Sequence, residues 1–221
     1  KLVSNLLDLG RIEAGVGLQL EKTSAREVME RVHSDLQVEA AQKHIHFDLE
    51  IPPYEIPLIM ADQSLLQQAL RNLVENAIKY SEPGGMVKLC LNVQPDMFIF
   101  EVVDNGIGIS PADQPRLFEK FYRIQRRGVP RERGSGLGLA ITYSILKRHG
   151  GAIAVQSQEG LGATFTIYLP PAEESPQQEI FSRVQFAKGK ILVMDDEYAV
   201  RMVVDRMLRR LGYDPTVTAN G

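Results

Sequence analysis

The sequence predicts a layered α/β domain followed by the beginning of a second domain. Three observations support this expectation. Apolar residues recur at helical spacing in several long segments, alternating apolar and polar residues mark short strands between them, and a stretch rich in proline and glutamate precedes a new apolar strand. With 44% hydrophobic and 24% charged residues, the 221-residue chain has the composition of soluble globular proteins.

Helices are predicted in four places, of which the first, residues 1–14, precedes the main domain. Residues 1–14 carry an apolar stripe with no N-cap before it, and we interpret them as the end of a longer bundle or coiled-coil helix; a short helix that packs locally is the alternative. Ser24 is expected to cap a helix that ends near Lys43, and Asp62 a helix that runs to Tyr80. A further helix is expected over residues 136–149.

Strands are predicted from alternation and from the turn residues that bound them. They are expected at residues 16–21, 46–51, 57–60, 86–93, 97–104, 152–157 and 163–169, with a hairpin turn at residues 94–96. We expect domain boundaries at residues 15–170 for the main domain, 171–187 for a linker, and 188–221 for the first strand and helix of another domain.

Composition excludes several function classes. There are 25 Lys and Arg against 28 Asp and Glu, so no basic excess indicates a nucleic-acid partner. No apolar run approaches the roughly 20 residues that cross a bilayer. Cys90 is the single cysteine and has no partner for an internal disulfide, so we expect a packing residue in a reducing compartment. The expected location is the cytoplasm, and membrane anchoring of the full-length protein is left open.

One side of the helix that begins at Asp62 is polar. Asn72, Glu75, Asn76 and Lys79 follow i, i+3, i+4 and i+7 spacing. Asparagine is a poor helix former, so two asparagines one turn apart favour a site over a merely solvated face, which is the alternative. Amide oxygens can hold a hydrated divalent cation, and a lysine at the next turn suits phosphate.

Two glycine-rich segments follow. Asp104-Asn105-Gly106-Ile107-Gly108-Ile109 ends a strand, where the glycines allow a ligand to approach the backbone; a tight turn is the alternative. Gly134-Ser135-Gly136-Leu137-Gly138-Leu139 opens a helix, whose free N–H groups favour an anion. The arginines between them suit a mobile phosphate-binding lid or a solvated loop: Arg123, Arg126, Arg127, Arg131 and Arg133.

In this order, the segments resemble the ATP-binding domain of histidine kinases, within the superfamily of gyrase, Hsp90, histidine kinase and MutL ATPases. Residues 71–81 resemble the N box, residues 104–109 and 134–139 the two glycine boxes, and residues 117–123 the F box, while Gly162-Ala163-Thr164-Phe165 stands at the last glycine motif. The resemblance implies a two-layer α/β sandwich with a mixed, largely antiparallel sheet. Residues 6–15 resemble the end of a kinase dimerisation helix.

The resemblance also implies roles for individual residues toward ATP and Mg²⁺. Asp104 would accept the adenine amino group, and Asn76, helped by Asn72, would ligate magnesium. Asn76 and, as a helper, Glu75 are the candidate catalytic residues. The remaining contacts would come from Lys79, Tyr80, Gly106, Gly108, Ile109, Arg123, Gly134, Gly136, Leu137, Gly138, Leu139 and Thr164.

Two aromatic residues and one histidine near these motifs have simpler explanations beside a functional one. Phe118 and Phe121 would anchor the lid, with simple core packing as the alternative. His149 is followed by Gly150-Gly151 at a helix end, which capping explains, so no catalytic role is assigned to it.

One departure from the superfamily bears on the reaction. Hydrolytic members carry a glutamate one turn before the magnesium asparagine, and Asn72 occupies that position here. A neutral amide cannot act as a general base, so transfer to a protein acceptor fits better than hydrolysis. An ATPase of the same fold, or a nucleotide-sensing module without transfer, are the competing interpretations.

Residues 190–221 resemble the start of a flavodoxin-like receiver domain, which implies a hybrid kinase. Asp195 and Asp196 match the acidic pair that binds magnesium there. No histidine of the chain lies in a phosphoacceptor motif, so we expect the acceptor His upstream, and the receiver's acceptor Asp beyond Gly221. The expected partners are ATP, a dimerisation domain that carries this His, and a receiver in cis or a separate response regulator. The full-length protein is expected to be a homodimer, while the fragment alone can be monomeric.

Overall fold

The computed structural model describes residues 6, 7, 9, 10, 12, 17–124, 135–171, 190–194, 204, 205, 208, 209 and 214–218. The chain divides into two compact units, Lys1–Pro176 and Gln177–Gly221. The expectations for Arg126, Arg127, Arg131, Arg133, Gly134, Asp195 and Asp196 lie outside the described residues.

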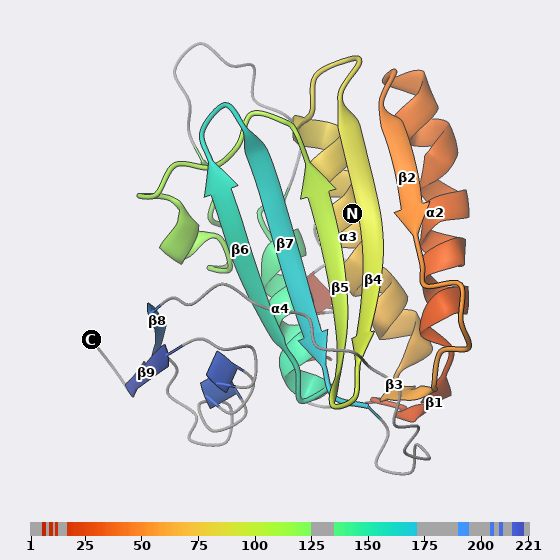
Figure 1. The fold of residues 1–221 in the computed structure, drawn as a ribbon. Helices are drawn as coiled ribbons and strands as arrows, with labels where there is room; N and C mark the ends of the chain where they lie inside the picture. Colours follow the sequence, from red (N-terminus) through yellow and green to blue (C-terminus); the bar gives the residue numbers. More distant parts are fainter. Residues whose placement is uncertain are drawn as a thin grey trace. The chain divides into compact units, whose positions relative to one another are not determined.

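The first unit is a two-layer α/β sandwich. Its five-stranded sheet has the order β2-β4-β5-β7-β6, in which β2 pairs with β4 in parallel and the other pairs are antiparallel. Helices α2 (Ala25–Gln42), α3 (Gln63–Tyr80) and α4 (Gly138–Arg148) lie behind one face of the sheet (Figure 1). The predicted two-layer sandwich with a mixed, largely antiparallel sheet is therefore confirmed.

The large sheet matches the predicted strands closely. Its members are β2 (His46–Glu50), β4 (Met86–Gln94), β5 (Met97–Asp104), β6 (Ala152–Gln158) and β7 (Gly162–Leu169). Gln94 pairs with Met97, so the hairpin turn is tighter than expected and contains only residues 95 and 96 between the strands.

Two short strands form a separate antiparallel pair, and here the prediction was partly wrong. The strand expected at residues 16–21 is β1 (Glu21–Thr23), and the one expected at 57–60 is β3 (Ile59–Ala61). Their bounds are set by mutual pairing, with Glu21 opposite Ala61 and Thr23 opposite Ile59. Gly17, with φ of 83°, lies in a turn before them.

The predicted caps of the two long helices are confirmed. The Ser24 hydroxyl accepts a hydrogen bond from the Glu27 N–H at 3.3 Å, and the Asp62 carboxylate accepts one from the Leu65 N–H at 3.1 Å. Each cap satisfies one of the N–H groups that a helix start leaves without an intrahelical partner.

The core lies between the helices and the inner face of the sheet. Alternate residues of β5, such as Phe98, Phe100 and Val102, are buried there against α3. A smaller apolar cluster joins Leu9 and Ile12 of the N-terminal helical segment to Ala69 of α3 and to Leu137, Ile141 and Ile145. Leu9 and Ile12 are thus packed onto apolar residues of α3 and α4.

In the second unit, β8 (Lys190–Met194) is the strand that the sequence predicts. It pairs in parallel with β9 (Asp214–Thr218), a strand that the sequence analysis did not anticipate. Among the described residues of the whole chain, no helix has the length and apolar character that a membrane crossing requires.

Candidate functional site

The end of α3 and the end of β5 meet at one end of the sandwich. The Ile107 N–H donates to the Tyr80 carbonyl oxygen at 3.2 Å, which attaches the segment after β5 to the last residue of α3. The N-box residues of α3 and the first glycine box, distant in sequence, therefore lie next to each other in the fold.

Asp104 is the last residue of β5 and is half-buried. Its Oδ1 atom accepts hydrogen bonds from the Gly106 N–H at 2.9 Å and from the Ala163 N–H at 3.3 Å. Burial raises the pKa of this carboxyl group above its ordinary value, and the two backbone hydrogen bonds act in the opposite direction. The carboxyl group is thus held by one oxygen in a partly desolvated position.

The glycines of the first box are required by the packing of the chain's own backbone. A Cβ on Gly106 would lie 2.5 Å from the Tyr80 carbonyl oxygen, and one on Gly108 would lie 2.0 Å from the carbonyl oxygen of Gln158. The space at these glycines is taken by the chain's own backbone rather than by an open approach for a ligand. They allow the box to pack between α3 and the β6–β7 hairpin.

Ser157 fastens this box to the hairpin, and sequence reasoning missed it. Its hydroxyl oxygen accepts from the Ile109 N–H at 2.8 Å and donates to the Gly162 carbonyl oxygen at 2.7 Å. A serine inside a strand carries no sequence signal of such a bridge, because the bridge depends on which segments pack beside the strand.

The start of α4 is held by Asn72. The side-chain amide of Asn72 donates to the Gly138 carbonyl oxygen at 3.2 Å and lies 3.5 Å from the Thr142 hydroxyl. Leu137 is buried, and its N–H donates to the Ser135 hydroxyl at 3.3 Å. The first turn of α4, from Gly138, therefore offers its helix-terminal N–H groups beside α3.

The F box is hydrogen-bonded to the second glycine box. The Phe121 N–H donates to the Gly136 carbonyl oxygen at 2.9 Å, and Gly136 has φ of 70°. Phe118 packs on the core and lies with its ring centroid 5.8 Å from that of Tyr143. Phe121 is 57% exposed and itself has φ of 64°, so core packing is wrong for this residue.

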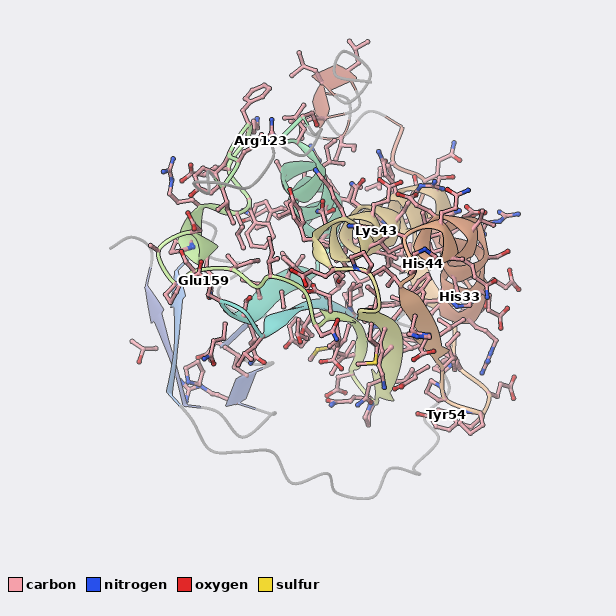
Figure 2. All side chains as sticks on the ribbon, turned by 90° about the horizontal axis from the view of Figure 1, so that it is seen from above. His33, Lys43, His44, Tyr54, Arg123 and Glu159 are labelled. Atoms are coloured by element: carbon pink, nitrogen blue, oxygen red, sulfur yellow. The ribbon has the colours of Figure 1, made fainter. Side chains whose placement is uncertain are left out.

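Polar contacts order the chain just before Arg123. The Tyr122 hydroxyl donates to Asp113 Oδ1 at 2.6 Å, and the Ser110 hydroxyl donates to Asp113 Oδ2 at 2.7 Å. The Arg116 guanidinium lies 4.3 Å from the centre of the Tyr122 ring. The hydrogen bond to Asp113 raises the pKa of Tyr122. Arg123, an exposed residue labelled in Figure 2, follows this cluster directly.

The polar residues of α3 have different neighbours. Glu75 forms an ion pair with Arg71 at 2.9 Å, and Arg71 also contacts Asp35 of α2 at 3.3 Å. The Lys79 ammonium lies 4.9 Å from the centre of the Tyr80 ring. Glu75 is therefore engaged on the α2 side of the helix, whereas Asn72 faces α4.

Thr164 lies on the opposite face of the sheet from Asp104. In the register of β5 and β7, Asp104 is opposite Ala163, and Thr164 is opposite Val103 and, on the other side, Gln156. Because neighbouring residues of a strand point to opposite faces, Thr164 cannot line a pocket between the helices and the sheet. The implied contact of Thr164 with adenine is thus wrong, and Ala163 is the residue on the Asp104 side.

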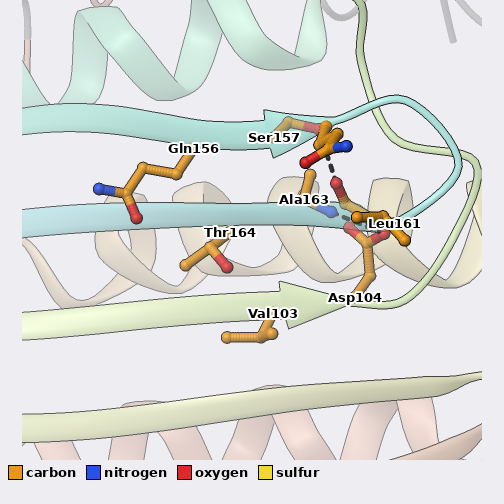
Figure 3. Close-up of a pocket in the computed structure, with 9 residues that line it drawn as sticks. Val103, Asp104, Gln156, Ser157, Leu161, Ala163 and Thr164 are labelled. Atoms are coloured by element: carbon orange, nitrogen blue, oxygen red, sulfur yellow. Dashed lines mark hydrogen bonds between the residues drawn. The ribbon is translucent and has the colours of Figure 1, made fainter.

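A shallow depression of about 300 Å³ lies on this outer face (Figure 3). Its lining comes from the residues around Thr164, from the end of the β6–β7 hairpin and from the strand ends that hold the Asp104 carboxylate: Val103, Asp104, Gln156, Ser157, Gln158, Leu161, Gly162, Ala163 and Thr164. Asn72 and the start of α4 lie on the helix side of the sheet, so the depression includes Asp104 and the last glycine motif but neither the N box nor the second glycine box.

Two other sequence expectations concern residues away from this end. His149 is buried and forms hydrogen bonds with the backbone at both ring nitrogens, which is a structural role at the end of α4. Cys90 is half-buried, 3.6 Å from Glu50 Oε2, and burial together with Glu50 raises the pKa of its thiol to about 12. The thiol therefore stays protonated, as a packing residue should.

Residues 61–173, more than half of the chain, match the family described as histidine kinase-, DNA gyrase B- and HSP90-like ATPases. The chain belongs to this family. Over 96% of its length it is 34% identical to the circadian input-output histidine kinase CikA of Synechococcus elongatus, of which it spans only 29%.

Solved structures agree with this placement. The structure of full-length ShkA in complex with AMPPNP is similar with a TM-score of 0.69 and 25% identity, covering 99% of this chain and 45% of that one. The mycobacterial sensor histidine kinase MprB is similar with a TM-score of 0.60 and 30% identity, covering 69% of this chain and 98% of that one. These similarities are all to histidine kinases.

Proposed function

We propose that the chain is the ATP-binding catalytic region of a hybrid sensor histidine kinase, which transfers the γ-phosphoryl group of ATP to a histidine of a dimerisation domain. One observation carries the proposal: the N box, the first glycine box and the start of α4 converge on one end of the domain through the Ile107–Tyr80 and Asn72–Gly138 hydrogen bonds. ATP would supply the phosphoryl group, and the protein would supply position and charge.

The residues at this end fit a nucleotide. Asp104 offers a carboxylate oxygen that is not needed by Gly106 or Ala163, in a partly desolvated place where a hydrogen bond to an adenine amino group gains strength. At the start of α4, backbone N–H groups and the positive end of the helix dipole suit phosphate oxygens. Two cations, Lys79 and Arg123, and the aromatic ring of Tyr80 would complete the nucleotide site.

The residues also fit Mg²⁺ that arrives with ATP rather than a resident ion. Within the described part of the chain, no group of three or more His, Cys, Asp or Glu side chains could hold a metal. Mg²⁺ commonly keeps few protein ligands when phosphates supply the rest. Asn76, one turn after Asn72 on the same side of α3, is the proposed ligand, with Asn72 in a supporting role.

The contact of Asn72 favours transfer over hydrolysis. Its amide is used as a donor to the Gly138 carbonyl oxygen, a contact that a glutamate carboxylate could not make. The position that would activate water in an ATPase is thus adapted to bind α4. Glu75, the other acidic candidate, is paired with Arg71.

For the second unit we propose the start of a receiver domain. Parallel pairing of β8 with β9 supports it, because parallel neighbours require a crossover connection like the first βα unit of a doubly wound sheet. On this proposal the partners are a dimerisation domain with its histidine, and either this receiver or a separate response regulator.

The proposal is tested with the chain as it stands and labelled Mg-ATP. The chain alone should bind ATP, take up no stable phosphate and hydrolyse ATP only at background rate. A separately supplied dimerisation domain should then be phosphorylated in trans, weakly, because the effective concentration of a covalent connection is lost. Asn76→Ala serves as the inactive control.

Each competing interpretation has its own outcome in this assay. Rapid phosphate release that Glu75→Gln abolishes would favour the ATPase. Tight ATP binding with no transfer to the histidine of any supplied dimerisation domain would favour a nucleotide-sensing module. Absence of ATP binding would overturn the proposal altogether.

A further inference from the structure

The last four carbonyl groups of α3 are all occupied by partners, most of them from outside the helix. The Ala77 oxygen accepts from the Ser81 N–H at 3.1 Å and from the Ser81 hydroxyl at 2.8 Å. The Ile78 oxygen accepts from the Lys43 ammonium at 2.8 Å, and the Lys79 oxygen accepts from the same ammonium. A helix end leaves these carbonyl groups without intrahelical partners. Lys43 is therefore the hydrogen-bond donor for two of the four.

Lys43 is held in place by the corner after α2. It is the C-cap of that helix, and the next residue, His44, has φ of 58°, which reverses the chain. The Ile45 N–H returns to the Ala40 carbonyl oxygen at 2.8 Å, and the His44 carbonyl oxygen accepts from the Gly84 N–H at 2.7 Å. Figure 2 shows Lys43 and His44 beside the end of α3. The backbone from which the Lys43 side chain extends is therefore held in place by these hydrogen bonds.

The fourth carbonyl links this corner to the candidate site. The Tyr80 oxygen accepts from the Ile107 N–H at 3.2 Å, one residue beyond Gly106, whose own N–H is bound by Asp104. A shift of the last turn of α3 would therefore move the partner of Ile107 and, with it, the backbone that orients the Asp104 carboxylate.

We propose that Lys43 is a positioning residue for nucleotide binding: its ammonium fixes the last turn of α3 against α2 and so sets Tyr80 and the Asp104 segment in the geometry that receives the base. This inference rests on the proposed function. The positive charge also opposes the negative end of the α3 dipole, which stabilises the same turn. Lys43 binds the backbone carbonyl groups of Ile78 and Lys79 and acts through the helix end.

The test compares Lys43→Met with Lys88→Met. Methionine keeps most of the lysine stem and removes the ammonium. Lys88 is the matched control, because its ammonium binds Glu50 Oε1 at 2.6 Å between β4 and β2, on the sheet face opposite to the one that buries Val87 and Leu89 in the core. Affinities for adenosine and for Mg-ATP are measured by calorimetry well below the unfolding midpoint of each variant.

Lys43→Met should weaken both ligands by about tenfold, a fraction of the value of a charge-assisted hydrogen bond, because the base end of the site is disturbed. Lys88→Met should bind both as the parent does. In Lys43→Met, the Ile107 amide should also exchange its hydrogen faster than in the parent, while the Ile45 amide, bonded to Ala40, should not. Lys43→Arg should restore part of the affinity.

Equal adenosine affinity in Lys43→Met and parent overturns the inference, as does weaker binding with unchanged exchange of the Ile107 amide. Should Lys43→Met not fold, Lys43→Gln decides: an intermediate loss supports the role, and parental affinity overturns it. A parent that binds no ATP contradicts the proposed function instead, and the exchange of the Ile107 amide still reports on Lys43.

Discussion

The His149 imidazole connects the ends of two helices: its Nε2 atom accepts a hydrogen bond from the backbone N–H of Asp62 at 2.9 Å. Its Nδ1 atom lies 2.8 Å from the Ile145 carbonyl oxygen, to which it donates. Asp62 in turn caps α3 and accepts from the Gln19 N–H at 3.1 Å. One buried histidine thus joins the end of α4 to the start of α3, at the end of the domain opposite to the candidate site.

His149→Ala should lower the free energy of unfolding by about 1 to 3 kcal/mol, because it leaves the buried Asp62 N–H without its partner. Mg-ATP affinity should stay at the parental value. Urea unfolding and calorimetry check the two parts, with the exposed His46→Ala as control. Loss of ATP binding at unchanged stability would assign His149 to the site after all.

Asp104→Asn should weaken ATP binding by about 10- to 150-fold, the value of a charge-assisted hydrogen bond of about 1.5 to 3 kcal/mol. Asparagine keeps the oxygen that Gly106 and Ala163 need and presents a donor, rather than an acceptor, to the adenine amino group. Exposed Asp48→Asn is the control. Parental ATP affinity in calorimetry would remove Asp104 from the base-binding role.

The same variant should be more stable than the parent at neutral pH. The pKa of Asp104 is raised by burial in the folded protein, so the folded state binds more protons than the unfolded state in the range just above the ordinary carboxyl pKa, and stability falls as pH rises through that range. The stability advantage of Asp104→Asn should therefore shrink as the pH falls from neutral through this raised pKa, and it should be lost below about 4, the ordinary pKa of the carboxyl group. Thermal unfolding across pH measures this difference, and a constant gap would contradict it.

Asn76→Ala should weaken Mg-ATP binding by about tenfold and leave adenosine binding near the parental value, because its proposed contact is with the cation. Calorimetry with Mg-ATP, metal-free ATP and adenosine separates these contributions. An equal loss for all three ligands would make Asn76 a structural residue of α3.

Gly136→Ala should destabilise the contact between Phe121 of the F box and Gly136 of the second glycine box. Its Cβ would lie 2.9 Å from the Phe121 backbone, and its φ of 70° costs an alanine about 1 to 2 kcal/mol. Gly138→Ala is the matched control, since its Cβ would meet only Asn72 at 3.9 Å at the start of a helix. The midpoint of thermal unfolding should fall for the first variant and hold for the second. Equal midpoints would contradict the Phe121–Gly136 contact.

Local features of this protein could be predicted from the sequence alone. Ser24 and Asp62 mark helix starts because capping depends on residues within one turn, and the strands at residues 86–93 and 97–104 follow from alternation and a short turn. The order of the N box, glycine boxes and F box also indicated the family and the sandwich fold, because these motifs are contiguous in the chain.

Tertiary structure decided what depends on distant segments. The register of β5 with β7 placed Thr164 on the outer face, and close packing assigned the space at Gly106 and Gly108 to the backbone of Tyr80 and Gln158. The ammonium of Lys43 reaches carbonyl groups 35 residues away. A side chain's spacing in the sequence gives its face on its own element, but its partners are set by how elements pack, which no local pattern encodes.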